Sequence, residues 1–163
     1  FAESHIDLEA VVVEMMRARR RTLAVAESCT GGLVGHMLTN VAGSSAAFLG
    51  GVVAYSNTAK VRDLGVSPDE LAQHGAVSDP VARAMADGVR VRFGADYGIG
   101  VTGIAGPDGG TEQKPVGLVF VAVSWSGGGS VREFRFAGPR AIIKQLSAQA
   151  ALDHLRLALD AGD

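Results

Sequence analysis

The sequence contains very little cysteine and few aromatic residues. A single cysteine among 163 residues excludes an internal disulfide and a zinc site built from cysteines. This usage fits a reducing compartment, and we expect a cytoplasmic location. Aromatic residues make up 6% of the chain and hydrophobic residues 47%, so the core has to be mostly aliphatic.

Long apolar runs and an excess of charge of one sign are also missing. No apolar segment is long enough to span a bilayer, so no membrane association is expected. The net charge of −2 argues against a nucleic-acid-binding protein, and we expect no direct nucleic-acid contact. The basic run at residues 17–21 fits the last turn of a helix, where cations interact favourably with the helix dipole.

Histidine is scarce, whereas glycine is abundant. The four histidines, His5, His36, His74 and His154, lack the spacing of metal ligands, so neither a metal nor another cofactor is expected. The 22 glycines must serve turns and close approaches of the backbone.

Hydrophobic patterns predict alternating helices and strands. Apolar residues at helical spacing predict a first helix around residues 8–15. Short apolar runs predict strands at residues 22–26, 48–55, 97–102, 117–123 and 131–136, with helices at 30–38, 56–64, from 67, from 78 and at 140–159. The glycine-rich turn at 126–130 should make the last two strands antiparallel. We therefore predict a single α/β domain over residues 1–163, a three-layer α/β/α sandwich with a mixed, mostly parallel sheet of about five strands.

Three polar motifs directly follow predicted strands, at residues 27–32, 55–60 and 102–106. The loops after parallel strands gather at one edge of a sheet, so the three motifs are expected to meet.

The first of these motifs, residues 27–32, joins a strand to a helix. Free amide N–H groups at such a turn suit a phosphate or carboxylate, which makes Ser28, Thr30 and Gly31 candidate substrate contacts. Capping by Ser28 or Thr30, with glycine for tight packing, explains the motif equally well. Cys29 has no neighbouring histidine to act as a base and is expected to be a buried structural thiol.

A hydroxyl, a phenol and an amine lie close together in the sequence at Ser45, Tyr55 and Lys60. A serine attacks a carbonyl only when a base takes its proton, and a lysine that has lost its charge can do so. Burial would lower the pKa of Lys60 accordingly, whereas an exposed Lys60 would be an ordinary surface residue. Ser45 also fits a polar turn, and Tyr55 fits either a proton relay or a core tyrosine. Ser56 is a rival nucleophile that is better suited to capping a helix.

A long loop rich in glycine and proline follows the third predicted strand, at residues 102–115. It lacks the spacing of a Walker loop and opens no helix, so it fits a segment that lines or covers a pocket. Thr102 and Gly103 are candidate ligand contacts at its start. Arg140, at the beginning of the last helix, suits a phosphate clamp with paired donors or a solvated arginine.

The motifs together resemble the CinA C-terminal domain family of competence/damage-inducible proteins. The resemblance covers nearly the whole chain and rests on residues 26–32, 43–45, 53–60 and 102–117, in this order. Two positions depart from the family pattern: Ala42 stands where proline is usual, and Pro139 stands where an acidic residue is frequent.

The resemblance implies an amidohydrolase that converts nicotinamide mononucleotide, a small nucleotide substrate, to nicotinate mononucleotide and ammonia. It implies that Ser45 is the nucleophile, with Lys60 and Tyr55 assisting it. The ligand contacts it implies are Ser28, Thr30, Thr102, Gly103 and Arg140. An apolar-rich edge favours a homodimer. The alternative is a catalytically silent domain that binds nucleotides, or that interacts with partners in competence or the response to DNA damage.

Overall fold

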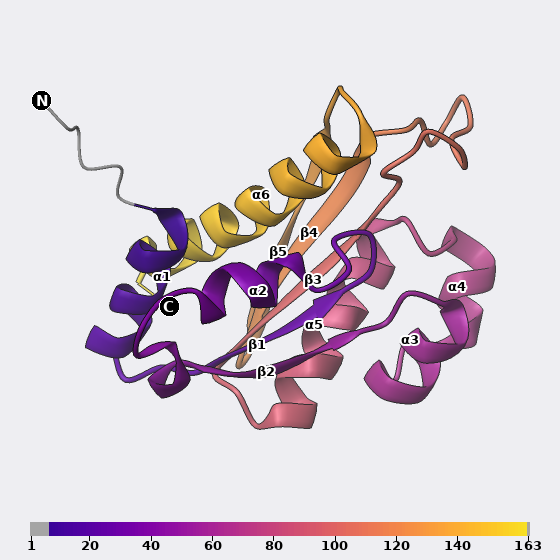
Figure 1. The fold of residues 1–163 in the computed structure, drawn as a ribbon. Coiled ribbons are helices and arrows are strands. Elements are labelled where there is room, and N and C mark those ends of the chain that lie inside the picture. The colour runs from indigo at the N-terminus through magenta and orange to yellow at the C-terminus, as the bar shows by residue number, and fades with distance from the viewer. Residues whose placement is uncertain (1–6, 163) are drawn as a thin grey trace, which may run out of the picture.

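A computed structural model describes residues 7–162 of the chain, whose strands form one sheet in the order β2-β1-β3-β4-β5. The strands are β1 (Leu23–Glu27), β2 (Phe48–Val53), β3 (Tyr97–Gly103), β4 (Leu118–Trp125) and β5 (Gly128–Arg135). The helices are α1 (Leu8–Ala18), α2 (Leu33–Thr39), the short 3-10 helix η1 (Ser44–Ala46), α3 (Asn57–Leu64), α4 (Pro68–His74), α5 (Asp79–Phe93) and α6 (Arg140–Asp160). Figure 1 shows α1, α2 and α6 on one face of the sheet and α3, α4 and α5 on the other.

The sheet is mixed, as the order of elements predicts. Strand β1 pairs in parallel with β2 and β3, whereas β4 runs antiparallel to both of its neighbours. The predicted α/β class with a mixed sheet of five strands is therefore confirmed. The turn before β5 is shorter than expected, because Gly128 and Gly129 already pair with Trp125 and Ser124.

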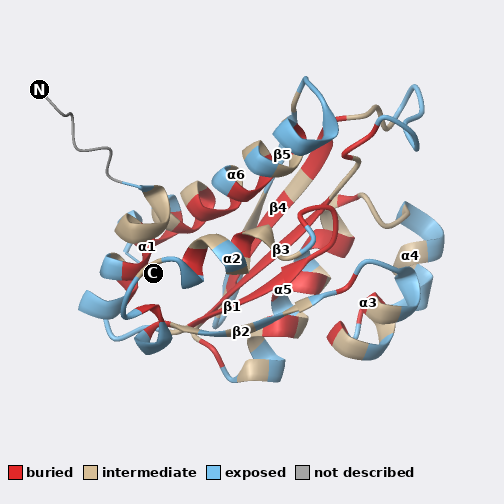
Figure 2. Cartoon of the chain, viewed as in Figure 1, coloured by how far each residue is buried: buried red, intermediate tan, exposed pale blue. Residues whose placement is uncertain are grey.

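The side chains of β1 alternate between the two faces of the sheet. Leu23 and Val25 belong to the core under α1, α2 and α6, whereas Ala24 and Ala26 belong to the core under α5. This period of two is the geometry of an extended strand. Figure 2 shows the buried residues concentrated along the central strands and the helix faces turned toward them.

Helix α5 lies unusually close to β3. A Cβ atom added to Gly98 would lie 2.2 Å from the carbonyl oxygen of Ala86, and one added to Gly100 would lie 2.5 Å from that of Ala82. Real Cβ atoms do not approach backbone oxygens so closely, so the small side chains of the two elements set the distance between them.

We expect the substitution Gly98→Ala to destabilise the protein by about 2–3 kcal/mol, because α5 would have to move away from the sheet. Gly35→Ala is the matched control: its Cβ would make only ordinary contacts, at 3.6 Å, inside α2. There alanine should be neutral or stabilising by up to about 1 kcal/mol. Urea unfolding of both variants measures the difference, and equal effects would contradict the close approach.

The parallel strands end together at one edge of the sheet. Glu27, the last residue of β1, lies opposite Val53 of β2 and Val101 of β3. The segments that follow these three strands therefore start side by side.

Candidate functional site

A pocket of about 200 Å³ lies at the edge where β1, β2 and β3 end. It is lined by Ser28, Cys29, Tyr55, Asn57, Lys60, Ala76, Val77, Thr102, Gly103, Ala105 and Arg140. The three motifs predicted to meet at this edge thus contribute to one cavity, and the start of α6 adds Arg140.

A serine and a lysine are in direct contact in this pocket. The Lys60 ammonium nitrogen Nζ lies 3.1 Å from the Ser28 hydroxyl oxygen Oγ, within hydrogen-bonding distance. Ser28 directly follows β1 and its amide donates to the carbonyl of Val101, which continues the strand pairing. Lys60 comes from the first turn of α3, which begins after a connection of three residues from the end of β2. The contact is therefore fixed by two adjacent parallel strands.

The Lys60 side chain is almost completely buried, with 1% of its surface exposed. Its other hydrogen-bond partners are the carbonyl oxygens of Ala54, at 2.9 Å, and Tyr55, at 3.4 Å. Among the described residues, no carboxylate forms an ion pair with it. Burial without a counter-charge disfavours the ammonium form and lowers the pKa of Lys60 below its ordinary value of 10.5. Such an amine suits the role of a general base.

Ser45 lies at the other end of the sheet, so the predicted contact between Ser45 and Lys60 is wrong. Ser45 is an exposed residue of η1, which precedes β2, and the neighbouring Ala47 accepts a hydrogen bond from the first residue of β1. Lys60 follows the opposite end of β2. The six residues of that strand span on the order of 20 Å, which excludes direct proton transfer.

Ser56 serves as a helix cap, as its sequence context predicts. Its hydroxyl oxygen accepts a hydrogen bond from the amide of Ala59 at 3.1 Å, and its backbone is extended. This capping satisfies one of the free amides of the first helical turn.

Tyr55 and Arg140 meet at the mouth of the pocket. The guanidinium of Arg140 donates to the phenol oxygen of Tyr55 at 2.9 Å and to the carbonyl of Gly106 at 2.7 Å. Tyr55 is 61% exposed, so it is not a core tyrosine. Arg140 therefore connects the segment after β2 with the long loop after β3.

The hydroxyl of Thr102 forms a hydrogen bond to the segment of the pocket wall that contains Ala76. It is buried and donates to the carbonyl of Ala76 at 2.8 Å, which fixes the segment between α4 and α5. Thr102 and Gly103, the candidate substrate contacts from this loop, both line the pocket, and the Thr102 hydroxyl proton is already donated to Ala76.

Thr30 and Gly31, two of the predicted substrate contacts, do not line the pocket. The amides at the start of α2 already donate to a carboxylate of the protein itself. The buried Glu27 carboxylate accepts hydrogen bonds from the amides of Val34, at 2.8 Å, and Gly35, at 3.1 Å. An internal carboxylate thus takes the place that the sequence suggested for a substrate anion at the helix terminus. Thr30 is buried, and its hydroxyl has no hydrogen-bond partner among the described residues.

Cys29 follows Ser28 and is buried, with 6% of its surface exposed. Burial raises the pKa of its thiol from 9.0 to about 12. A thiol with so little thiolate is a poor nucleophile, in agreement with the structural role predicted for Cys29.

We expect Cys29 to react with a disulfide reagent such as 5,5′-dithiobis(2-nitrobenzoic acid) about a thousandfold more slowly in the folded protein than in urea. A shift of about three pKa units lowers the thiolate fraction by that factor near neutral pH. Absorbance at constant pH follows the reaction, and equal rates in both conditions would contradict the assignment.

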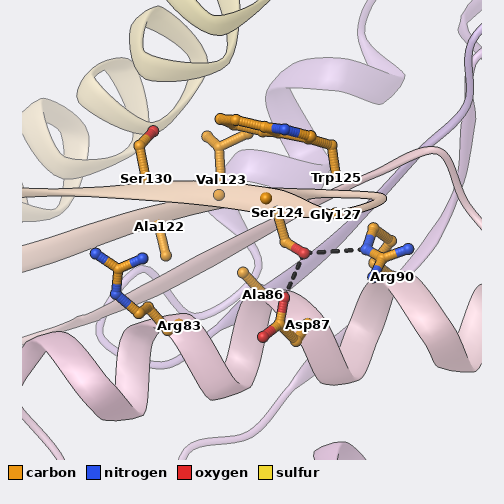
Figure 3. Close-up of a pocket in the computed structure, with 12 residues that line it drawn as sticks. Arg83, Ala86, Asp87, Arg90, Ala122, Val123, Ser124, Trp125, Gly127 and Ser130 are labelled. Atoms are coloured by element: carbon orange, nitrogen blue, oxygen red, sulfur yellow. Dashed lines mark hydrogen bonds between the residues drawn. The ribbon is translucent and has the colours of Figure 1, made fainter. Parts of the chain in front are cut away.

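A second hollow, of about 630 Å³, lies between α5 and the hairpin of β4 and β5, near the start of β3 (Figure 3). Figure 3 shows Ser124 pointing toward Asp87 and Arg90, where its hydroxyl donates to the Asp87 carboxylate and accepts from Arg90. These three groups are engaged with one another, so none of the three is a free nucleophile or a free base.

The described residues contain no group of three or more histidine, cysteine and acidic side chains that could hold a metal ion. His5 lies outside the described residues. In residues 7–162, the helices are too short or too polar to cross a lipid bilayer.

The sequence motifs located the pocket but paired Lys60 with a serine that lies far from it. Ser28, predicted as a substrate contact, lines the pocket and lies beside the buried amine. The signal was present in the sequence, because Ser28 and Lys60 both follow parallel strands and Ser45 precedes one.

The chain matches the family model of the CinA C-terminal domain over residues 5–159. A CinA-like protein of Gemmatimonas aurantiaca is 54% identical over 167 residues, which cover 100% of this chain and 39% of the relative. A CinA-like protein of Desulfovibrio desulfuricans is 55% identical over 152 residues, covering 91% of this chain and 36% of the relative. The chain thus spans less than two fifths of the length of these curated relatives.

Solved structures show the same fold over nearly their full length. The competence/damage-inducible protein CihA from Agrobacterium tumefaciens superposes with a TM-score of 0.90 at 39% identity, covering 94% of this chain and 93% of that one. A CinA superfamily protein from Klebsiella pneumoniae superposes with a TM-score of 0.91 at 34% identity, covering 94% and 96%.

Proposed function

Because the chain belongs to the CinA C-terminal domain family, we propose that it hydrolyses the carboxamide of nicotinamide mononucleotide, with Ser28 as nucleophile and Lys60 as base. The observation that carries this proposal is the contact of 3.1 Å between the Ser28 hydroxyl and the buried Lys60 amine. The choice of substrate rests on the family resemblance, and the choice of nucleophile and base rests on the geometry of the pocket.

The proposed reaction begins with proton transfer. Neutral Lys60 takes the proton of the Ser28 hydroxyl as its oxygen attacks the carboxamide carbon, which gives a tetrahedral intermediate. Lys60 then returns the proton to the departing nitrogen, ammonia leaves, and an ester of Ser28 with nicotinate mononucleotide remains. Lys60 next takes a proton from a water molecule as the water oxygen attacks the ester carbon. When the ester bond breaks, Lys60 returns this proton to the Ser28 oxygen, which releases nicotinate mononucleotide and restores the hydroxyl and the neutral amine.

The turn after Ser28 is suited to stabilise the negative charge that develops on the carboxamide oxygen. The amide of Cys29 donates to no backbone acceptor among the described residues and interacts with its own thiol, and in this proposal it turns to the carboxamide oxygen as the charge develops. Tyr55, whose phenol oxygen accepts a hydrogen bond from Arg140, lines the same pocket and is proposed to contact the substrate.

The proposal is tested by incubating the purified chain with nicotinamide mononucleotide and measuring ammonia and nicotinate mononucleotide. Equal amounts of the two products, with no need for added metal, are expected. Calorimetry that detects binding of the nucleotide without release of ammonia would instead support a nucleotide-binding domain without catalysis.

A further inference from the structure

Lys144 lies one helical turn beyond Arg140 on α6, above the turn that carries Ser28. Its Nζ is 3.7 Å from the position that a Cβ atom would take on Gly31. Gly31 is exposed and has a φ of +61°, a conformation that favours glycine. The ammonium group therefore sits directly over an open stretch of backbone next to the candidate site.

Lys144 is the cation near this site that has nothing to bind. Its side chain is partly buried, and it forms neither a hydrogen bond nor an ion pair with any described residue. Arg140, the residue that the sequence suggested for a phosphate, is already bonded to Tyr55 and Gly106. Lys60 is likewise engaged by Ser28 and two carbonyl oxygens.

The surroundings of Lys144 favour an anion. The first turn of α6 contains no acidic residue, and its N-cap position, Pro139, provides no side-chain acceptor. Lys144 is close enough to Cys29, the residue that follows Ser28, for its charge to favour the thiolate form there. The nearest acidic group at this turn, Glu27, already accepts two hydrogen bonds from amides of α2.

We infer that Lys144 binds the anionic group of the substrate and thereby selects phosphorylated over unphosphorylated carboxamides. This inference rests on the proposed function, in which that group is the phosphate of nicotinamide mononucleotide. The carboxamide then lies at Ser28 and the phosphate above Gly31, while Arg140 positions Tyr55 rather than holding the phosphate. An ammonium ion and a phosphate form a charge-assisted hydrogen bond, which is stronger than a neutral one.

The test compares nicotinamide mononucleotide with nicotinamide riboside, which lacks the phosphate. Binding is measured by calorimetry in the Ser28→Ala background, so that no turnover interferes. Adding Lys144→Gln should weaken binding of the mononucleotide about tenfold or more and leave binding of the riboside unchanged. Lys144→Arg should retain the preference for the phosphorylated ligand, because it keeps the charge.

Arg135→Gln, an equal change of charge on the outer strand β5, is the matched control and should alter neither affinity. Equal losses for both ligands, or no loss for the mononucleotide, would overturn the role of Lys144, as would a failure of the mononucleotide to bind. Binding that depends on Lys144 in a wild-type chain that releases no ammonia would refute the amidase and retain this inference. Ammonia release that is unaffected by Lys144→Gln would refute the role of Lys144 and retain the amidase.

Discussion

Replacement of Ser28 by alanine is expected to lower the rate of ammonia release from nicotinamide mononucleotide by at least about a thousandfold. The hydroxyl is the only nucleophile in contact with the buried amine among the described residues, and losses of this size follow removal of a catalytic serine. Ammonia release is measured at saturating and at low substrate, so that kcat and KM are obtained separately. Because the alanine is smaller by one oxygen, binding of the nucleotide should be retained.

Ser45→Ala is the matched control for this experiment. The exchange of atoms is identical, but Ser45 is exposed on η1 at the other end of the sheet, so kcat and KM should both stay within about twofold of the wild-type values. Thermal unfolding of both variants checks that each one folds. A large loss with Ser45→Ala and a small one with Ser28→Ala would refute the assignment and restore the nucleophile implied by the family resemblance.

The two serines show what sequence reasoning can and cannot decide. Both stand in polar turns with a glycine two or three residues away, so their local patterns are similar. They differ in topology: Ser28 follows β1, whereas Ser45 precedes β2. Residues that follow the parallel strands share an edge with Lys60, so the predicted order of elements along the chain already contained the information to prefer Ser28.

The sequence shows what a buried Lys60 could do, but it does not show whether Lys60 is buried. The sequence indicates that the lysine follows an apolar strand in the first turn of a helix, but long side chains in such positions are usually solvated. Its burial depends on the acceptors that meet it, the carbonyls of Ala54 and Tyr55 and the hydroxyl of Ser28. Such contacts between segments far apart in the chain have no local signal.

The contacts that α6 makes with the rest of the protein could not be predicted from the sequence either. The periodicity of residues 140–159 predicts the helix, and the structure confirms it as Arg140–Asp160. The pattern does not say which turn of that helix passes over residues 28–32. The sequence therefore gives no signal for Lys144, because its role depends on the exposed Gly31 beside it and on the hydrogen bonds that already engage Arg140.

Replacement of Lys60 by methionine, which preserves much of the side-chain volume without the amine, is expected to reduce kcat nearly as much as Ser28→Ala. The double variant should be no slower than either single one, because a nucleophile and its base act as a unit. Losses that multiply in the double variant would show that the two residues act independently. Lys114→Met is the matched control, since the Lys114 amine is bonded to the carbonyl of His74 outside the pocket.

The pH dependence of the wild-type enzyme gives a second test of Lys60. The free amine is the active form, so kcat/KM should rise with pH and level off above the pKa of Lys60 in the free enzyme. Burial lowers that pKa, so the rise should be complete at a pH below the ordinary lysine value of 10.5. The residual activity of Lys60→Met should lack this rise, and Lys114→Met should retain it. A wild-type profile that falls as the pH increases over this range would mean that the ammonium, not the amine, is the form required for catalysis.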